Sequence, residues 1–188
     1  MRALAAIAFA LLLLASCGRQ QEEPPSADAA TTAFGSVAEV TTYLASLDPH
    51  IQRIGQLQAQ YEEALAEARQ GASQRKGTGR NLAEKAAAVK PELQAILKAL
   101  DAIEPPPLLA PFHRDTRKLV ATRLDAYGRT VEGWEAEQKG DEFASLYRQV
   151  EVKLAEANQL ILQLNAQMQQ INAALEAASG QAVPGAPS

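Results

Sequence analysis

The stretch that decides the fold lies between Asp141 and about Ala178 and reads DEFASLYRQVEVKLAEANQLILQLNAQMQQINAALEAA. Its apolar residues recur at steps that alternate between four and three positions, the spacing of one face of a continuous helix. These residues are Phe143, Tyr147, Val150, Leu154, Ala157, Ile161, Leu164, Met168, Ile171 and Leu175. Such a helix would be roughly 55 Å long and would not stay folded alone in water. We therefore expect the rest of the chain to cover this apolar face.

Burial should follow this stripe of apolar residues. We expect Leu154, Ile161 and Leu164 to be nearly fully buried, and Gln163, which lies outside the stripe, to be exposed. Between positions 156 and 176 the outer residues are amides without charge, so this face could meet another helix or a polysaccharide. A solvated helix surface is the alternative interpretation.

Three further amphipathic segments precede this stretch. We expect helices over about 36–71, 81–103 and 108–139, because apolar residues recur at helical spacing in each segment. Pro49 should kink the first helix and Pro91 should bend the second, since proline lacks the donor that an interior turn needs. Each segment is therefore long enough to pair with its neighbours.

Residues at the ends of these segments fit known helix signals. Asn81 and Glu84 have the spacing of a capping box at the start of the second helix. Gly140 should end the third helix and Asp141 should start the fourth. These short connections predict an all-α fold, specifically an up-down-up-down antiparallel four-helix bundle over residues 36–178 with a frayed tail at 179–188. A dimer of helical hairpins is the alternative.

The composition agrees with one such domain. The chain has 188 residues, of which 47% are hydrophobic and only 5% aromatic, so aliphatic side chains must supply most of the core. The formal net charge of -4 argues against general nucleic-acid binding. Cys17 is the only cysteine, which excludes an internal disulfide and any multi-cysteine metal site.

The first 17 residues have the layout of a secretory signal: one basic residue, an apolar run, then small residues. The apolar run is shorter than the about 20 residues that a membrane span needs. Leu14-Ala15-Ser16-Cys17 resembles the lipobox of bacterial lipoproteins. The resemblance implies removal of residues 1–16, acylation of Cys17 and anchoring in a membrane of the cell envelope. Gly18, where inner-membrane lipoproteins often carry aspartate, favours the outer membrane. An ordinary signal with an incidental cysteine is the alternative.

Residues 17–35 are mostly polar or small, with a Pro24-Pro25 pair and no periodicity, which is typical of a flexible tether. A coil of this length would span roughly 20 to 25 Å. The tether would hold the helical domain away from the lipid headgroups.

The sequence contains no recognisable catalytic motif. Neither His50 nor His113 has a glutamate three positions earlier, so the paired Glu-x-x-His ligands of di-iron bundles are absent. Nothing resembles a nucleophile elbow or a His-Glu-x-x-His zinc helix. We therefore expect a protein that is not an enzyme and that needs no cofactor.

The alternative function is a helical bundle that binds a small molecule, haem or a metal. When the helices are stacked antiparallel, His50, His113 and Met168 fall within about three residues of one level, some 5 Å at helical rise. Bundles build cofactor sites between facing helices. Ile51 and Phe112 compete with the histidines for the interior, so a core methionine with two boundary histidines is the simpler interpretation.

A second candidate site lies at the end of the bundle far from the tether. The turn after the third helix should bring aromatic residues close to the basic loop that follows the first helix. The residues concerned are Trp134, Phe143, Tyr147, Arg75, Lys76 and Arg80. Large aromatic anchors beside donors for anionic groups are typical of binding surfaces. The aromatic residues could instead seal the end of the core.

Together these patterns indicate a lipid-anchored envelope protein that acts by binding, as a scaffold or adaptor. Its membrane contact is the N-terminal anchor, and its expected partner is an envelope protein or polymer. The sequence leaves the identity of that partner and the oligomeric state open.

Overall fold

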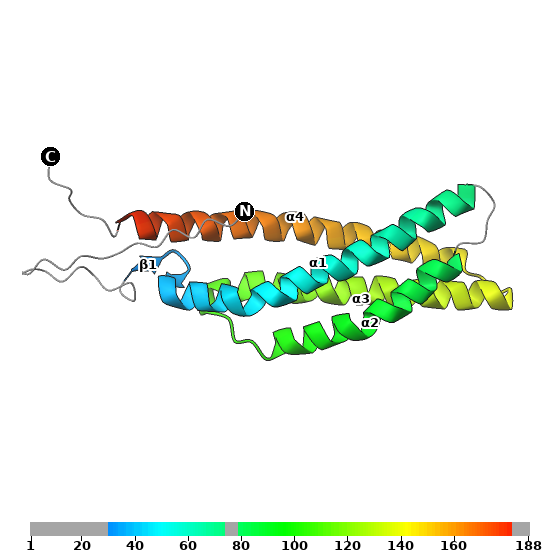
Figure 1. The fold of residues 1–188 in the computed structure, drawn as a ribbon, viewed down its shortest axis with the longest axis horizontal. Helices are drawn as coiled ribbons and strands as arrows, with labels where there is room; N and C mark the ends of the chain where they lie inside the picture. Colours follow the sequence, from blue (N-terminus) through cyan, green and yellow to red (C-terminus); the bar gives the residue numbers. More distant parts are fainter. Residues whose placement is uncertain (1–29, 74–78, 182–188) are drawn as a thin grey trace, which may run out of the picture.

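The computed structural model describes residues 30–73 and 79–181, and its architecture is all-α, as predicted. Figure 1 shows long helices lying side by side along an elongated molecule. The elements in chain order are β1 (Thr31–Thr32), β2 (Gly35–Ser36), α1 (Val37–Ser73), α2 (Gly79–Asp101), the short 3-10 helix η2 (Pro107–Leu109), α3 (Ala110–Lys139) and α4 (Ala144–Gln181). None of the helices in these ranges has the length and apolar character needed to cross a bilayer.

Pro49 inside α1 and Gly140 at the end of α3 act as predicted. Helix α1 continues through Pro49, as expected for one helix rather than two. Gly140 ends α3 in the left-handed region with φ 76°, and its N–H donates to carbonyl groups of the last helical turn. Glycine suits this position because it has no Cβ to clash there.

The predicted caps at the starts of α2 and α4 are wrong. Helix α2 begins at Gly79, so Asn81 lies inside it and its amide donates to Glu67 of α1 at 2.6 Å. At the start of α4 the carboxylate that caps is that of Glu142, which accepts a hydrogen bond from the Ser145 N–H at 3.0 Å. In both places a nearby partner competes with the expected cap.

A small hairpin begins the described chain. Strand β1 pairs antiparallel with β2, and the Thr32 hydroxyl donates to the Gly35 carbonyl at 2.9 Å. Strand β1 lies beside α4 (Figure 1). Phe34, which follows β1, packs against the main core. The folded part therefore starts before the boundary expected at residue 36, because one aromatic side chain in the supposed tether finds an apolar surface.

The main core lies between α1, α2 and α3. Tyr61 of α1 stacks on Tyr127 of α3 with ring centroids 4.0 Å apart, and its hydroxyl lies 2.7 Å from that of Thr130. Around this pair pack buried aliphatic residues from all three helices, including Leu47, Leu57, Val89, Leu93, Leu100 and Val120. This aliphatic core confirms the expectation drawn from the composition.

Helix α3 carries every buried polar or charged side chain recorded for the described residues. These are His113, Asp115, Thr116, Thr122, Arg123 and Thr130. Helix α3 contacts both α2 and α4, and its side chains also reach α1, so its buried residues face three neighbouring helices. Polar groups on such a helix need partners inside the protein.

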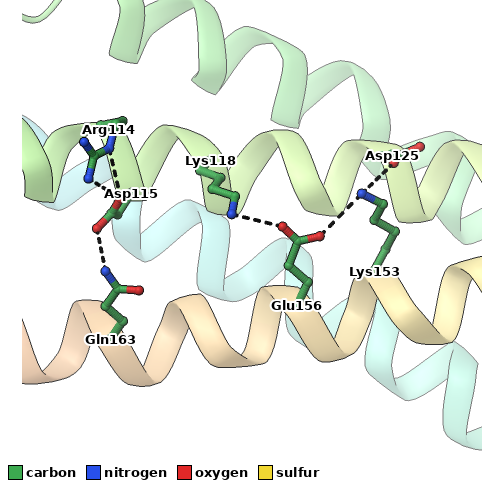
Figure 2. A network of polar contacts seen from close by, with 7 residues as sticks. All are labelled: Arg114, Asp115, Lys118, Asp125, Lys153, Glu156 and Gln163. Carbon is green, nitrogen blue, oxygen red and sulfur yellow. Dashed lines mark hydrogen bonds and ion pairs between the residues drawn. The ribbon is translucent and has the colours of Figure 1, made fainter.

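Helix α4 is fastened to α3 by a row of polar contacts, shown in Figure 2. The buried carboxylate of Asp115 accepts a hydrogen bond from Gln163 at 2.8 Å. Further along, Lys118 of α3 pairs with Glu156 at 3.1 Å, and Lys153 bridges Glu156 and Asp125 at 3.4 Å each. Part of the amide-rich face of α4 therefore serves contact with α3.

The predicted burial of α4 is only partly correct. Val150, Ala157 and Ile171 of the stripe are buried and Gln163 is exposed, as expected. Leu154, Ile161 and Leu164 are only half-buried, contrary to the prediction. The reason is that α4 packs on α3 but leaves an open space towards α1, so the stripe is not covered along its full width.

Candidate functional site

The space between α1 and α4 is an apolar groove of about 260 Å³. We call it the α1–α4 groove. Residues from three helices line it: Ile51, Ile54, Gly55 and Gln58 from α1, Phe112, Thr116 and Leu119 from α3, and Ile161, Leu164, Asn165 and Met168 from α4. Its volume is slightly below the range of about 300 to 1,000 Å³ that is usual for small-molecule pockets. Mostly aliphatic walls with a few polar groups are also usual for such pockets.

Gly55 lines the groove from α1 and contributes no side chain to it. A Cβ atom added at this position would meet no neighbouring atom within 4 Å, so no close packing requires a glycine here. A glycine inside a helix destabilises it by about 0.5 to 1 kcal/mol relative to alanine. The cost is not offset by packing, whereas the missing side chain leaves the groove wider.

Arg123 is the most unusual buried group in the described chain. Its side chain is 1% exposed, and its Nη1 donates to the hydroxyl of Tyr127 at 3.2 Å. Its Nε and Nη2 have no hydrogen-bond partner within the described ranges. Removing a charged group from water without an opposite charge costs several kcal/mol. The guanidinium group therefore has unused capacity to bind an anion.

Carboxylates elsewhere on α3 do not neutralise Arg123. Asp115 is also buried, but it lies eight residues earlier, about 12 Å along the helix axis, and bonds to Gln163 and Gln167 of α4. Asp125 pairs with Arg129 at 2.9 Å and with Lys153 at 3.4 Å. Asp115 and Asp125 are thus committed to other partners.

The sequence did not single out Arg123. The apolar Leu124 is only half-buried in the structure, while the charged Arg123 beside it is fully buried. The signal that would have found it is the spacing of Thr116, Arg123 and Thr130, seven positions apart on one side of α3. Hydropathy alone favours leucine over arginine at a core position.

His113 is held as part of the packing between α1, α2 and α3. Its Nδ1 lies 3.1 Å from the hydroxyl of Tyr43, and its ring also hydrogen-bonds the backbone of Leu100. Burial lowers the pKa of His113, and the positive charge of Arg117 lowers it further. With these two hydrogen bonds in place, the ring would have to give one up before it could ligate a metal.

Met168 faces the α1–α4 groove, whereas neither histidine lines it. Ile51 and Phe112, the sequence neighbours of His50 and His113, occupy the groove with Met168. Among the residues that the structure describes, no cluster of three or more His, Cys, Asp or Glu side chains could hold a metal ion. The groove thus combines Met168 with aliphatic and aromatic neighbours.

The aromatic residues predicted at the far end do come together. A Cβ atom on Gly79 would lie 3.1 Å from the Trp134 ring, so the indole packs against the first residue of α2. Tyr147 covers Gly133 of α3 in the same way, and its hydroxyl donates to Glu137 at 3.2 Å. Burial, with the nearby Glu137 carboxylate, raises the pKa of Tyr147 to about 12.

The basic part of this predicted surface is only partly described. Arg80 is exposed and forms an ion pair with Glu84 at 2.7 Å, so its positive charge is partly balanced by that carboxylate. Arg75 and Lys76 lie outside the described residues, as does Cys17. Phe143 is 37% exposed and meets Tyr147 edge-on with ring centroids 5.9 Å apart. Trp134 and Tyr147 thus join helices at this end.

Comparison with known proteins adds no relative to these observations. No protein-family model matches the chain, and no curated protein or solved structure shows significant similarity to it.

Proposed function

We propose that this protein is a lipid-anchored module of the bacterial cell envelope that acts by binding, as a scaffold or adaptor, and not by catalysis. The proposed location in the cell envelope rests on the signal-like N-terminus and on Cys17, which ends a sequence that resembles a lipobox. Gly18 supports the outer membrane over the inner one. The lack of a catalytic motif in the sequence supports the binding role.

The binding surface in this proposal is the α1–α4 groove, and this groove is the observation that carries the proposal. Apolar surface left open to water is unfavourable, and a large patch of it usually marks an interaction site. Ile51, which is 38% exposed, borders the groove together with the half-buried Leu164 and Met168. An apolar group from a partner would complete the packing that α1 and α4 leave unfinished.

The fold in this proposal is the up-down-up-down type, with the groove as an incomplete contact between its first and last helices. Contacts between α3 and α4 support this, because they show that the two helices are antiparallel. Later residues of α3 meet earlier residues of α4. The pairs are Asp115 with Gln163, Asp125 with Lys153, and Arg129 with Gln149. Such an arrangement places α1 next to α4. The groove then occurs where the bundle would otherwise close.

A Cys17→Ala variant tests whether the protein is anchored to a membrane through Cys17. It should lose acylation and membrane retention, while its helical circular dichroism stays unchanged because Cys17 lies 20 positions before the start of α1 at Val37. Cell fractionation and mass spectrometry of the N-terminus measure the two effects. Equal retention of the variant and the wild-type chain in membranes would contradict anchoring through Cys17.

The binding role is tested at Met168, since Met1 is the only other methionine in the chain. In the full chain held in lipid nanodiscs, the 13C-methyl NMR signal of Met168 reports directly on the groove. We expect 1-octanol, a neutral apolar probe, to shift this signal in a saturable way. Absence of any shift would contradict the groove as a binding surface.

Two leucine substitutions provide a matched pair for this test. Gly55→Leu puts a side chain into the groove and should prevent the shift, while it raises helix stability by about 0.5 to 1 kcal/mol. Gly180→Leu makes the same change at another helix position with no atom within 4 Å, but away from the groove lining. It should leave the shift of Met168 unchanged.

A further inference from the structure

We propose that the α1–α4 groove binds the alkyl chain of a medium-chain fatty carboxylate, with the carboxylate held by the buried guanidinium group of Arg123. This inference rests on the proposed function, because it uses the same groove. It adds the chemical class of the ligand: an anionic amphiphile with one carboxylate.

The charge of the ligand follows from the state of Arg123. The Nε and Nη2 atoms of this side chain have no partner within the described residues, and the side chain is 1% exposed. Guanidinium groups pair best with carboxylates and phosphates, because their planar N–H donors match two oxygens at once. A bound carboxylate would give the two unpaired nitrogens the partners that the protein lacks.

The position of Arg123 links it to the groove. Phe112, Thr116 and Leu119 line the groove from α3, and Arg123 is the next residue on that face, about 6 Å beyond Leu119 along the axis. Its Nη1 donates to the hydroxyl of Tyr127, one turn further along α3, and its Nε and Nη2 are left without a partner among the described residues. Arg123 does not itself line the groove, so its guanidinium group lies buried just beyond the end of the apolar walls, and a local opening must expose it to a ligand.

Contacts between α1 and α3 agree with this position. Tyr43 meets His113 and Tyr61 meets Thr130, so positions 69 to 70 residues apart lie at about the same level. This offset places Arg123 level with Ile54, which lines the groove from α1. The apolar walls and the unpaired cation thus belong to one site.

The size and lining of the groove select the rest of the ligand. Its volume of about 260 Å³ suits a short, slender chain and not a large ring system. Ile51, Leu164 and Met168 offer such a chain aliphatic and thioether surface without a competing charge. A single alkyl chain fills this space with its head group at the end nearest to Arg123.

The experiment uses the full chain in nanodiscs and the Met168 methyl signal, with octanoate, 1-octanol and octylamine as probes of equal chain length. We expect octanoate to bind about tenfold or more tightly than 1-octanol, the size of effect that hydrogen bonds to a charged group produce. Octylamine, which carries a positive charge, should bind most weakly of the three. Equal affinities for octanoate and 1-octanol would overturn the role of Arg123.

Substitutions at Arg123 provide an independent measurement. Arg123→Met should remove the preference for octanoate but keep the binding of 1-octanol, because the apolar walls remain. It should also hold or raise the melting temperature, since replacing an unpaired buried charge with an apolar side chain relieves its desolvation. Arg123→Lys keeps a charge without the planar fork and should show an intermediate preference. Unchanged preference in Arg123→Met would overturn the inference.

The outcomes separate this inference from the proposed function. If 1-octanol shifts Met168 and Gly55→Leu prevents the shift, but octanoate shows no advantage, the groove stands as a binding surface and the carboxylate ligand is wrong. If none of the probes shifts Met168, both proposals fail.

Discussion

The hydroxyl group of Tyr43 lies 3.1 Å from Nδ1 of His113, and both side chains are buried between α1 and α3. Burial is the main reason that the pKa of His113 is lowered from 6.5, with Arg117 adding to the effect. Burial also raises the pKa of Tyr43, so its hydroxyl stays protonated. The pair is therefore neutral in the folded protein at pH 7.

This pair predicts a loss of stability in mild acid. Because the unfolded chain binds a proton at His113 more readily than the folded one, stability is complete above about pH 6.5 and falls as the pH drops towards the lowered folded pKa. The melting temperature of the wild type should therefore decrease as the pH is lowered below about 6.5. His113→Gln should show a smaller decrease. Identical decreases would exclude His113 as the cause.

The hydrogen bond between the hydroxyl groups of Tyr61 and Thr130 predicts that removing one hydroxyl lowers the free energy of unfolding more than removing the other. Tyr61→Phe should cost about 0.5 to 1.5 kcal/mol, because Thr130 still donates to the Ala126 carbonyl at 3.0 Å. Thr130→Val should cost about 1 to 3 kcal/mol, because it leaves the buried Tyr61 hydroxyl without a partner. Urea denaturation measures both. A smaller cost for Thr130→Val than for Tyr61→Phe would contradict the assignment.

Three leucines test the distribution of the core. Leu93→Ala, at a fully buried position, should cost about 2 to 5 kcal/mol. Leu164→Ala in the groove should cost less, because the side chain is already half-exposed. Leu162→Ala, at a position that is 63% exposed, should change the free energy of unfolding by less than about 0.5 kcal/mol. A cost for Leu164→Ala as large as that for Leu93→Ala would show that the groove is closed in solution.

The polar contacts between α3 and α4 predict a weak, salt-sensitive contribution. Hydrogen bonds from Lys118 and then from Lys153 lower the pKa of Glu156 from 4.5. Their stabilising effect is therefore present above about pH 4.5 and is lost as the pH falls through the folded value. Since these side chains are partly exposed, Glu156→Gln should cost less than about 1 kcal/mol, and high salt should reduce the cost. A cost independent of salt would point to packing.

Trp134 tests whether the aromatic end is structural. Its contact with Gly79 predicts that Trp134→Ala lowers the melting temperature, with a cost of about 1 to 3 kcal/mol because the ring is half-buried. Phe143→Ala, at a 37% exposed position, serves as the comparison and should cost less. If Trp134→Ala instead weakens capture of an envelope partner without lowering the melting temperature, this end is a binding surface.

Periodicity was enough to predict the helices and their approximate ends. The long helix α4 and the glycine stop at Gly140 both follow from local rules, and the structure agrees with them. The caps at Asn81 and Asp141 failed because the side chains that compete for these positions, Glu67 and Glu142, are set by tertiary packing or by an adjacent residue. Local signals place a helix more reliably than its first turn.

The candidate site could not be predicted in the same way. Whether Leu164 and Met168 end in a closed core or in a groove depends on how closely α1 approaches α4, which a stripe of apolar residues does not specify. Arg123 was missed because a charged residue at a core position contradicts the hydropathy rule. Deviations of this kind are expected where binding rather than folding has determined the residue.

The separate packing of α4 has a consequence for local motion. Ile171 is the only buried residue that α4 contributes to the main core among the described residues, whereas Ala157 and Leu160 form a smaller cluster with Leu119 of α3. A helix with few buried apolar contacts opens at lower free energy than the whole protein unfolds. Native-state hydrogen exchange should therefore be faster in the middle of α4 than in α3. Such local opening would widen the groove from one side and give a ligand its way in.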